Sequence, residues 1–514
     1  MFRDARAIED GSILDADVCI VGTGAAGASI AVGLAGSGLR VVVLEAGGER
    51  AEADVEALGA LETPGLPIAS SSRQRFFGGT TNTWWGKVAL LDESDFAPRE
   101  HVAGSGWPFG LDELLPYYQR ACVLMGIPDL TRPTPSASHA GSTLGSGGLA
   151  VKAFYWPRKA PNFGDLYRRA VRSAANVSTI LHANVTEIDF DEHGRADRLV
   201  VTSSSSRSFS VRPRVAILAC GGIENARILL NSGLSAVNDT IGRYYMDHPR
   251  GHGGVIETTR SIAGLSAAYW SGKRAGSVRV RLGVGLTPEA QASEGVLNSY
   301  VNLTPDYEGG GVKAIRNLYR RGPGALKDGA TARGLVTGLP AIARYLRFKR
   351  FGRGWVRTIS VDNYMEQEPR AANRVTLSDR RDALGRPLAR VEWSLSEQDR
   401  RSMRTLHATL AEELARRGMG LLRSPILEDD ESFTAVNDAA HHLGGTRMGT
   451  SPRMSVVDGD SRVHGSSNLY IAGSSVFPTG GSANPTLTIV ALAARLADTA
   501  RESLQTPVTV GEGR

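Results

Sequence analysis

The chain has 514 residues, of which 41% are hydrophobic and 22% charged, with a formal net charge of +6; this length and composition predict an ordinary globular protein of roughly two or three domains. It has no run of eighteen apolar residues, and its start, MFRDARAIEDGS, lacks the apolar middle of a signal peptide, so we expect a cytoplasmic protein without a membrane-spanning helix. The three cysteines, Cys19, Cys122 and Cys220, are too few and too far apart for a disulfide framework or a zinc site, so we interpret them as apolar side chains in a reducing compartment.

The first strong pattern is the segment of residues 15–47, DADVCIVGTGAAGASIAVGLAGSGLRVVVLEAG. It predicts a buried strand at residues 17–21, followed by a GxGxxG turn at Gly22, Gly24 and Gly27 and by a helix of small residues at 25–37. A second strand follows at 40–44, and the acid Glu45 stands at its end. Glycines let the backbone approach a pyrophosphate, and the helix start offers free N–H groups. We therefore expect a dinucleotide site in which Glu45 accepts hydrogen bonds from a ribose.

The next segments alternate between loops and regular elements. Residues 75–91, RFFGGTTNTWWGKVALL, form a glycine-rich loop, and a helix follows Gly106 with Leu111, Leu114, Leu115 and Tyr118 on one face. Residues 130–149 are rich in Ser, Gly, Pro and Thr, which indicates a loop or lid. Strands return from residue 176 and end in a turn at Gly221 and Gly222, where the backbone can again pass close to a ligand.

The carboxyl-terminal third predicts a strand–turn–strand unit at residues 373–393, a charged helix at 396–418 and a final buried helix. In that last helix Asn484 is expected as the N-cap and Pro485 as the first helical residue. Since the dinucleotide segments are scattered, we expect one mixed α/β protein with a discontinuous nucleotide domain (residues 1–75, 145–255 and 436–514). Residues 76–144 form a loop and lid segment, and residues 256–435 form a substrate domain with a basic insertion at 313–357.

Taken together, these segments resemble the glucose-methanol-choline (GMC) family of FAD oxidoreductases. The resemblance rests on VGTGAAGASIA, FGGTTNTWWG, LACGGIENARILL, IGRYYMDHP and HHLGG…SANPTLT, and it covers nearly the whole chain. Within the family, HLGGTRMG and SANPTLT are similar to the pyranose-oxidase-like branch of bacterial sugar and glycoside oxidoreductases. The resemblance implies an FAD domain threaded with a substrate domain that is built on an antiparallel sheet.

The resemblance also implies which residues bind the cofactor and perform the chemistry. The residues expected to bind FAD are Gly22, Gly24, Ala25, Ala26, Gly27, Glu45, Ala46, Gly78, Gly79, Thr80, Asn82, Thr83, Val185, Cys220, Gly221, Gly473, Ser474, Asn484, Pro485 and Thr486. Some pyranose oxidases carry the flavin covalently on a histidine at the position of Thr83, so we expect non-covalent FAD here. Ser474 stands near the place where many relatives have an acid.

Oxidising an alcohol requires the loss of a hydride from carbon and of a proton from oxygen. A neutral imidazole can take the proton, and an amide can hold the hydroxyl. His441 and His442 are both candidate bases. The interval of 43 residues between His441 and Asn484 suits the wider family and favours His441, whereas alignment on LGGT favours His442. Asn484 is the expected hydroxyl anchor, and the start of its helix is expected to favour negative charge on the flavin.

Other residues carry open alternatives. Trp84 and Trp85 suit either stacking on a sugar or core packing, and His248 and His252 are interpreted as structural, with no metal site expected. Between Lys313 and Arg357 there are twelve Lys or Arg residues and a single acid, Asp328. This segment suits a solvated insertion or subunit contact better than an anionic membrane or an acidic partner, and it matches no nucleic-acid-binding module.

The sequence thus predicts an FAD-dependent oxidation of an alcohol on a sugar, glycoside or polyol, with oxygen or another oxidant as electron acceptor. Two alternatives stay open at this point. One is the same chemistry on a non-sugar alcohol, and the other is a flavin-binding protein without turnover.

Overall fold

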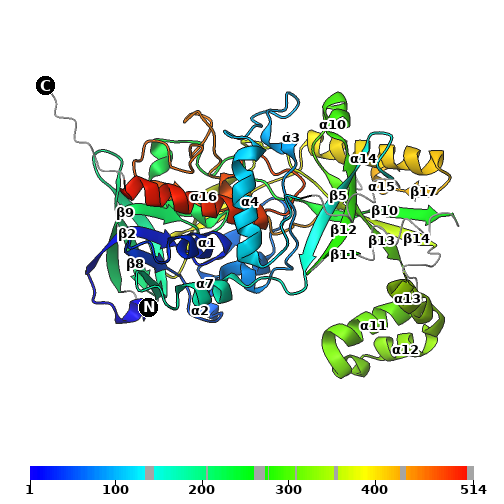
Figure 1. Cartoon of the computed structure of the whole chain (residues 1–514), viewed down its shortest axis with the longest axis horizontal. Coiled ribbons are helices and arrows are strands. Elements are labelled where there is room, and N and C mark those ends of the chain that lie inside the picture. Colours follow the sequence, from blue (N-terminus) through cyan, green and yellow to red (C-terminus); the bar gives the residue numbers. More distant parts are fainter. Residues whose placement is uncertain are drawn as a thin grey trace.

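The protein is described from a computed structural model that covers residues 1–132, 144–203, 207–259, 273–275, 277–306, 310–351, 357–428 and 436–505. Two large β-sheets lie side by side with helices packed on and between them, and a group of three helices projects away from the second sheet (Figure 1). Most of the expected 130–149 lid falls on residues 133–143, outside the described residues. No helix within the described ranges has the length and apolar character needed to cross a bilayer.

The first sheet has eight strands in the order β1-β6-β3-β2-β9-β8-β7, with β18 also paired to β9. The strands are β1 (Phe2–Asp4), β2 (Ile13–Val21), β3 (Val41–Leu44), β6 (Val177–Leu181), β7 (Ala183–Phe190), β8 (Ala196–Ser203), β9 (Ser208–Leu218) and β18 (Leu469–Ile471). The pairs around β2 and β3 are parallel, and their side chains are buried because helices cover the sheet. Strands from the beginning, the middle and the end of the chain therefore build one nucleotide-type sheet.

Helices from distant parts of the chain pack together on this sheet. Small side chains of α1 (Ala25–Leu34) allow a close approach to α16 (Thr486–Gln505), so that Gly33 lies against Ala497. In turn, α16 contacts α4 (Leu111–Met125), and α7 (Phe163–Val171) contacts α1 (Figure 1). The expected apolar face of α4 is only partly buried: Leu114 and Tyr118 are fully buried, whereas Leu111 and Leu115 are half-buried.

The second sheet is antiparallel, with the order β11-β12-β13-β14-β10-β17 and β5 paired to β12. The strands are β5 (Leu149–Pro157), β10 (Arg250–Thr258), β11 (Lys273–Ala275), β12 (Val278–Leu286), β13 (Tyr300–Asp306), β14 (Thr358–Tyr364) and β17 (Gly420–Arg423). The expected domain segment 145–255 therefore contributes β5 and the first part of β10 to this sheet, and β6 to β9 to the first. Helices α14 (Glu397–Arg416) and α15 (Pro425–Glu428) cover one side of it.

A smaller sheet, β15-β16-β4, joins β15 (Arg374–Arg381) and β16 (Pro387–Glu392), the strands of the expected unit at 373–393, to β4 (Leu61–Glu62). It packs on α8 (Glu224–Asn231). Among the described residues, three further α-helices are short: α2 (Ala53–Ala57), α3 (Glu93–Phe96) and α10 (Pro288–Glu294). In α14 the expected charged helix is present, and Ser396 caps it through a capping box with Asp399.

The basic insertion forms α11 (Gly310–Arg321), α12 (Gly329–Thr337) and α13 (Leu339–Phe351), the helices that project in Figure 1. They lie between β13 and β14, which are neighbours in the sheet. The apolar residues of α13 do not pack as one face, since Ile342 is buried while Ala343 and Leu346 are exposed. The insertion is therefore an addition to a hairpin and not part of the layered core.

Candidate active site

A cavity of about 1200 Å³ runs between the two large sheets. One wall is formed by the turn after β2, the 75–91 loop and the start of α16, and the opposite wall is formed by β5, β12 and β14. Pockets that hold one drug-sized ligand occupy about 300–1,000 Å³. The cavity is therefore large enough for more than one small molecule.

The turn after β2 provides a backbone cradle at the beginning of α1. Gly22 has a φ of +101°, and a Cβ there would lie 2.6 Å from the carbonyl oxygen of Ala219. A Cβ on Gly27 would lie 1.9 Å from the carbonyl oxygen of Gly22, so only glycine lets α1 close against the turn. Gly24 precedes α1 without any side-chain cap, and a Cβ there would face open space. Uncapped N–H groups beside open space suit a bound phosphate.

Glu45 fixes this cradle from the end of β3. Its carboxylate accepts hydrogen bonds from the backbone N–H groups of Thr23 (3.1 Å) and Gly47 (3.1 Å) and from the Thr23 hydroxyl. The side chain is buried, and it also lines the cavity. Glu45 thus orders the turn before any ligand binds and still faces the cavity, where a ribose hydroxyl could donate to it.

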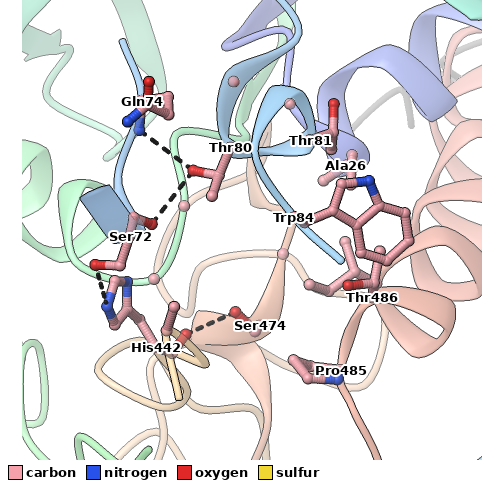
Figure 2. A pocket seen from close by; sticks show the side chains of 18 of the residues that line it. Ala26, Ser72, Gln74, Thr80, Thr81, Trp84, His442, Ser474, Pro485 and Thr486 are labelled. Carbon is pink, nitrogen blue, oxygen red and sulfur yellow. Dashed lines mark hydrogen bonds between the residues drawn. The ribbon is translucent and has the colours of Figure 1, made fainter. Parts of the chain in front are cut away.

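The 75–91 loop closes over the same turn. The backbone N–H of Gly78 donates to the Thr23 hydroxyl (3.0 Å), and a Cβ on Gly79 would lie 3.1 Å from Cα of Gly24. Thr80, Thr81 and Trp84 of this loop line the cavity together with Ala26 and Thr486, and Figure 2 shows these side chains around it. The Thr80 hydroxyl donates to the carbonyl of Ser72 (3.3 Å). The loop and the last helix therefore meet at one part of the cavity.

Most of the residues expected from the sequence line the cavity. Those that do are Gly22, Gly24, Ala25, Ala26, Glu45, Ala46, Gly79, Thr80, Thr83, Val185, Cys220, Gly221, His441, His442, Gly473, Ser474, Asn484, Pro485 and Thr486. Gly27, Gly78 and Asn82 do not line it. Gly27 and Gly78 hold the cradle as described, and Asn82 donates to the carbonyls of Phe77 (3.0 Å) and Gly79 (2.8 Å). Their place in the structure is to shape the loops.

The final helix begins one residue later than expected. The carbonyl of Pro485 accepts the first helical hydrogen bond, from Ile489 (2.9 Å), so α16 starts at Thr486 and Pro485 precedes it. Asn484 is then free of a capping role, and its amide nitrogen donates to Nε2 of His441 (3.1 Å). Its Oδ1 atom is buried without a hydrogen-bond partner among the described residues. An unpaired buried acceptor at a cavity wall points to a ligand that donates to it.

His441 is oriented by a second histidine. Nε2 of His248 lies 2.9 Å from the carbonyl oxygen of Gly481, which can only accept, so this nitrogen carries the proton. Nδ1 of a neutral His248 is then an acceptor, and it lies 2.8 Å from Nδ1 of His441. His441 therefore donates from Nδ1 and keeps a lone pair on Nε2, which agrees with the donor that Asn484 presents.

The histidines are held in the neutral form. Burial lowers the pKa of His248 to about 4, and burial together with His248 and Lys87 holds the pKa of His441 well below its ordinary value. The backbone supports this arrangement: Ala440, which precedes the pair, has a φ of +62°, in the left-handed region. At neutral pH the cavity therefore contains an imidazole nitrogen that is ready to accept a proton.

His442 points to a different part of the wall. Its Nε2 lies 3.3 Å from the hydroxyl of Ser72, and its backbone carbonyl accepts from the Ser474 hydroxyl (2.6 Å), as Figure 2 shows. Burial and Arg73 lower its pKa to about 3. Ser474 thus fixes the histidine segment through its hydroxyl.

Behind the histidines lies a buried acidic pair. Asp247 accepts backbone hydrogen bonds from His248 (2.6 Å), Ala439 (2.9 Å) and His441 (3.4 Å) through one oxygen. Atoms of Asp247, Asp438 and His442 that could hold a metal ion lie within 4.8 Å of one another. Burial raises the pKa of Asp247 to about 7 and also raises the pKa of Asp438. The backbone contacts give Asp247 a clear part in positioning His441.

The Gly481 carbonyl that holds His248 is itself anchored by a buried ion pair. The Gly481 N–H donates to Glu366 (3.0 Å), which forms two hydrogen bonds with Arg99 (2.8 and 2.6 Å). Arg99 and Glu366 are both almost fully buried. Paired charges with satisfied partners fix geometry even where their net stabilisation is small. The proton-accepting nitrogen of His441 is thus tied through His248 and Gly481 to the protein interior.

Sequence reasoning missed the far wall of the cavity. Residues from β5, β12 and β14 line it, together with Lys87: Trp156, Arg158, Arg279, Arg281 and Tyr364. Apolar and polar residues alternate in these strands as in any half-buried strand, and the sequence does not show which face of a strand borders a cavity. Trp84 and Trp85 both line the cavity, and Trp85 is 80% exposed. His248, interpreted as structural, contacts a candidate base.

The residues present fit FAD. A cradle that only glycines permit, an uncapped helix start and a buried acid at the end of the second parallel strand are the features that a dinucleotide needs. The cavity continues from this cradle past Trp84 to His441 and Asn484, so one elongated ligand can reach both ends. The 75–91 segment carries no histidine.

Comparisons with known proteins agree with this geometry. Residues 17–244 match the family described as FAD dependent oxidoreductase, and residues 369–493 match GMC oxidoreductase. The fructose dehydrogenase large subunit of Gluconobacter japonicus is 25% identical, covering 94% of this chain and 97% of its own. The 6'''-hydroxyparomomycin C oxidase of Streptomyces lividus is 26% identical over 93% and 90%. A C-glycoside 3-oxidase of Microbacterium trichothecenolyticum is 36% identical over 26% of this chain and 25% of its own.

Solved structures share the fold. Pyridoxine 4-oxidase from Mesorbium loti superposes with a TM-score of 0.60 at 19% identity, covering 94% of this chain and 99% of its own. Formate oxidase superposes with a TM-score of 0.57 at 16% identity, covering 96% and 99%. The fold is therefore common to these proteins.

Proposed function

Because this chain is an FAD-dependent oxidoreductase of the GMC family that acts on CH–OH groups, we propose that it oxidises a hydroxyl of a sugar or glycoside to a carbonyl, with His441 as the base. The names of its relatives support the substrate class, since they include a fructose dehydrogenase and oxidases of an aminoglycoside and of C-glycosides. One observation carries the assignment of the base: Nε2 of His441 faces the amide of Asn484 at 3.1 Å while its Nδ1 is engaged by His248.

The turn after β2, Glu45 and the 75–91 loop would hold FAD, with the start of α1 at its pyrophosphate. When bound, FAD supplies the acceptor for the hydride that leaves the substrate carbon. Everything else falls to the protein, which must hold the alcohol, remove its proton and keep water away. Trp84 and the small residues before α16 provide apolar surface for that purpose.

A substrate hydroxyl that enters between His441 and Asn484 can replace their mutual hydrogen bond. It would accept from the Asn484 amide nitrogen and donate to Nε2 of His441, so both protein groups keep a partner. As the hydride departs, Nε2 takes the hydroxyl proton, and the amide donor stabilises the negative charge that develops on oxygen. Oδ1 of Asn484 is left to accept from another donor of the substrate, which gives this buried acceptor the partner that it lacks among the described residues.

His442 supports this machinery without taking the proton. Its Nε2 already meets the Ser72 hydroxyl, and its backbone carbonyl is held by Ser474, so its position shapes the cavity next to the cradle. A Cβ on Gly222 would lie 2.1 Å from the His442 carbonyl oxygen, which shows how tightly the segment is enclosed.

The test compares His441→Ala with His442→Ala in anaerobic stopped-flow reduction of the bound flavin by a panel of sugars, glycosides and polyols. Loss of a general base lowers a rate by about 10² to 10⁴-fold, so we expect this loss for His441→Ala at unchanged flavin content. We expect a smaller loss for His442→Ala, which removes a supporting contact. Equal, near wild-type rates in both variants would contradict the assignment of a histidine base, and the larger loss at His442 would reassign it.

A further inference from the structure

The far wall of the cavity carries an excess of positive charge. Lys87, Arg158, Arg250, Arg279 and Arg281 line it. Among the residues that the structure describes, Lys87, Arg158, Arg250 and Arg279 have no carboxylate within 4.0 Å, the distance that defines an ion pair. Lys87 is half-buried, whereas Arg158, Arg250 and Arg279 are exposed. Cations that lie close together repel one another, so such a cluster favours the binding of an anion.

Lys87 is the most enclosed of these cations. Its ammonium donates to the Tyr300 hydroxyl (2.5 Å) and lies 3.9 Å from the centre of the Phe154 ring and 4.6 Å from that of Tyr364. Burial holds the pKa of Lys87 well below its ordinary value, and Arg281 and Arg250 lower it further. Aromatic rings attract a cation but do not neutralise it. The site is therefore poised to gain from an added negative charge.

The sheet sets the arginines beside this lysine. Arg279 and Arg281 are two residues apart on β12, so their side chains leave the same face, and in the register with β5 they stand opposite Trp156 and Phe154. The guanidinium of Arg281 lies 5.9 Å from the centre of the Trp156 ring, and Arg279 is exposed to the cavity. The guanidinium groups of Arg279 and Arg281 and the ammonium group of Lys87 thus lie on the same wall of the cavity, next to aromatic side chains.

Two nearby acids, Asp362 and Asp438, form no ion pair with Lys87 or Arg279. Asp362 of β14 accepts a hydrogen bond from the Thr304 hydroxyl (3.2 Å), and it stands in register with Asn302. Asp438 also lines the cavity, and its backbone carbonyl accepts from Nε of Arg250 (3.1 Å). Neither carboxylate lies within 4.0 Å of Lys87 or Arg279, so these two cations are left for a ligand.

The cofactor does not account for these charges. The cradle that suits a pyrophosphate is made of backbone at the start of α1, on the eight-stranded sheet. Arg279 and Arg281 extend from the other sheet, and the rings around Lys87 are contributed by that same sheet. Lys87, Arg279 and Arg281 are therefore placed on the side of the cavity opposite the cradle, where a substrate would bind.

We infer that the substrate carries an anionic group, a carboxylate or a phosphate, which binds between Lys87, Arg279 and Arg281 while a hydroxyl of the same molecule reaches His441 and Asn484. This inference rests on the proposed function for the identity of the reacting hydroxyl. Arginine and lysine bind such groups through charge-assisted hydrogen bonds, and Trp156 offers a flat face beside them for a sugar ring. A cationic aminoglycoside would be repelled by the same cluster.

The experiment measures binding and turnover separately on the FAD-loaded protein. Dissociation constants for D-glucose, D-glucuronate, D-glucose 6-phosphate and D-glucosamine are obtained anaerobically from the change in tryptophan fluorescence, and flavin reduction is followed with the same four compounds. Arg279→Gln, on an exposed strand position, removes one cation with little risk to folding. Arg281→Gln is the second variant. Arg423→Gln, at the exposed end of β17 in the same sheet and away from the cavity, is the matched control.

We expect one or both anionic sugars to bind about 10- to 100-fold more tightly than D-glucose, because hydrogen bonds to charged groups have about that effect on affinity. Arg279→Gln and Arg281→Gln should remove most of this preference, whereas Arg423→Gln should leave both the preference and the binding of D-glucose intact. Tighter binding of glucuronate alone would assign a carboxylate, and of the phosphate alone a phosphoester.

Equal binding of the neutral and anionic sugars, or a preference that survives in both arginine variants, would overturn the inference. If neutral sugars reduce the flavin under those conditions, the proposed function stands without the anionic group. If an anionic sugar binds through Arg279 but no hydroxyl compound reduces the flavin, the anion site stands and the proposed function fails.

Discussion

His441 depends on its neighbours for both its tautomer and its charge. Alone, an imidazole has a pKa near 6.5 and can carry its proton on either nitrogen. Here the Gly481 carbonyl sets the proton on His248, and His248 sets the proton on His441. The same burial that removes water lowers the pKa of both rings. As a result, His441 is a weak base that is unprotonated at neutral pH.

This arrangement predicts the pH dependence of flavin reduction by a neutral sugar. A base acts in its unprotonated form, and since the pKa of His441 is held well below its ordinary value, the rate should stay level from about pH 6 to pH 9. Activity should be lost only as the pH falls below the ordinary histidine range. Stopped-flow rates across this range, with a sugar that carries no charge, separate His441 from the titration of Lys87.

His248→Leu provides the matching variant. It removes the acceptor for Nδ1 of His441, so the imidazole can place its proton on Nε2, where it cannot act as a base. We expect the rate to fall by about 10- to 100-fold at every pH, the usual effect of losing a group that orients a reacting side chain. His248→Gln, which still offers an acceptor, should lose less. The pH prediction for the wild-type protein has its own contradicting outcome. If the wild-type rate rises as the pH increases through 6.5, His441 titrates normally and is not held neutral.

At the level of elements, the sequence predicts local structure well where glycine and apolar patterns act over a few residues. The β2–α1–β3 unit, α14 and the β15–β16 pair lie where their patterns place them. The start of α16 differs by one residue, because Asn484 bonds to His441 and leaves the first carbonyl to Pro485. The start of this helix therefore depends on a contact between residues that are 43 positions apart, and local sequence propensity does not predict such a contact.

Two glycines of one turn should have separable effects. Gly27→Ala places a Cβ 1.9 Å from the Gly22 carbonyl oxygen, so α1 must move away from β2, at a cost of about 1–3 kcal/mol. The cofactor-free protein should therefore melt at a lower temperature. Gly24→Ala meets nothing within 4 Å, so its cofactor-free form should melt like wild type.

The difference appears when FAD is added. Gly24→Ala puts a methyl group where backbone must approach the ligand, so its affinity for FAD should fall although its fold is intact. Thermal melts of both variants with and without FAD make the comparison. If Gly24→Ala binds FAD as tightly as wild type and gains the same thermal shift, the turn is not the cradle for the cofactor.

For the molecule as a whole, the sequence predicts that distant segments build one nucleotide domain. That division into domains stays a prediction, but β2, β9 and β18, which come from these segments, are adjacent in one sheet. It does not predict the cation cluster of the far wall. Nothing in the local sequence distinguishes Lys87, Arg279 and Arg281 from other charged residues. Their charges come to line one cavity only because the fold brings the two sheets together. Pairings between remote strands, which carry this information, leave no trace in local patterns.

The basic insertion can be removed at a point that the sheet defines. Asp306 and Thr358 are register partners on β13 and β14, so an Asn-Gly turn can join them in place of residues 307–357. Those residues carry twelve Lys and Arg in a chain of net charge +6, and none of the described ones lines the cavity. The shortened protein should bind FAD and oxidise its substrate at a rate within about twofold of wild type, but it should no longer bind to a cation exchanger at pH 7, since its net charge becomes negative. Flavin content, melting temperature and rate are measured together. A folded, yellow protein that has lost its rate would show that the projecting helices contribute to the site itself.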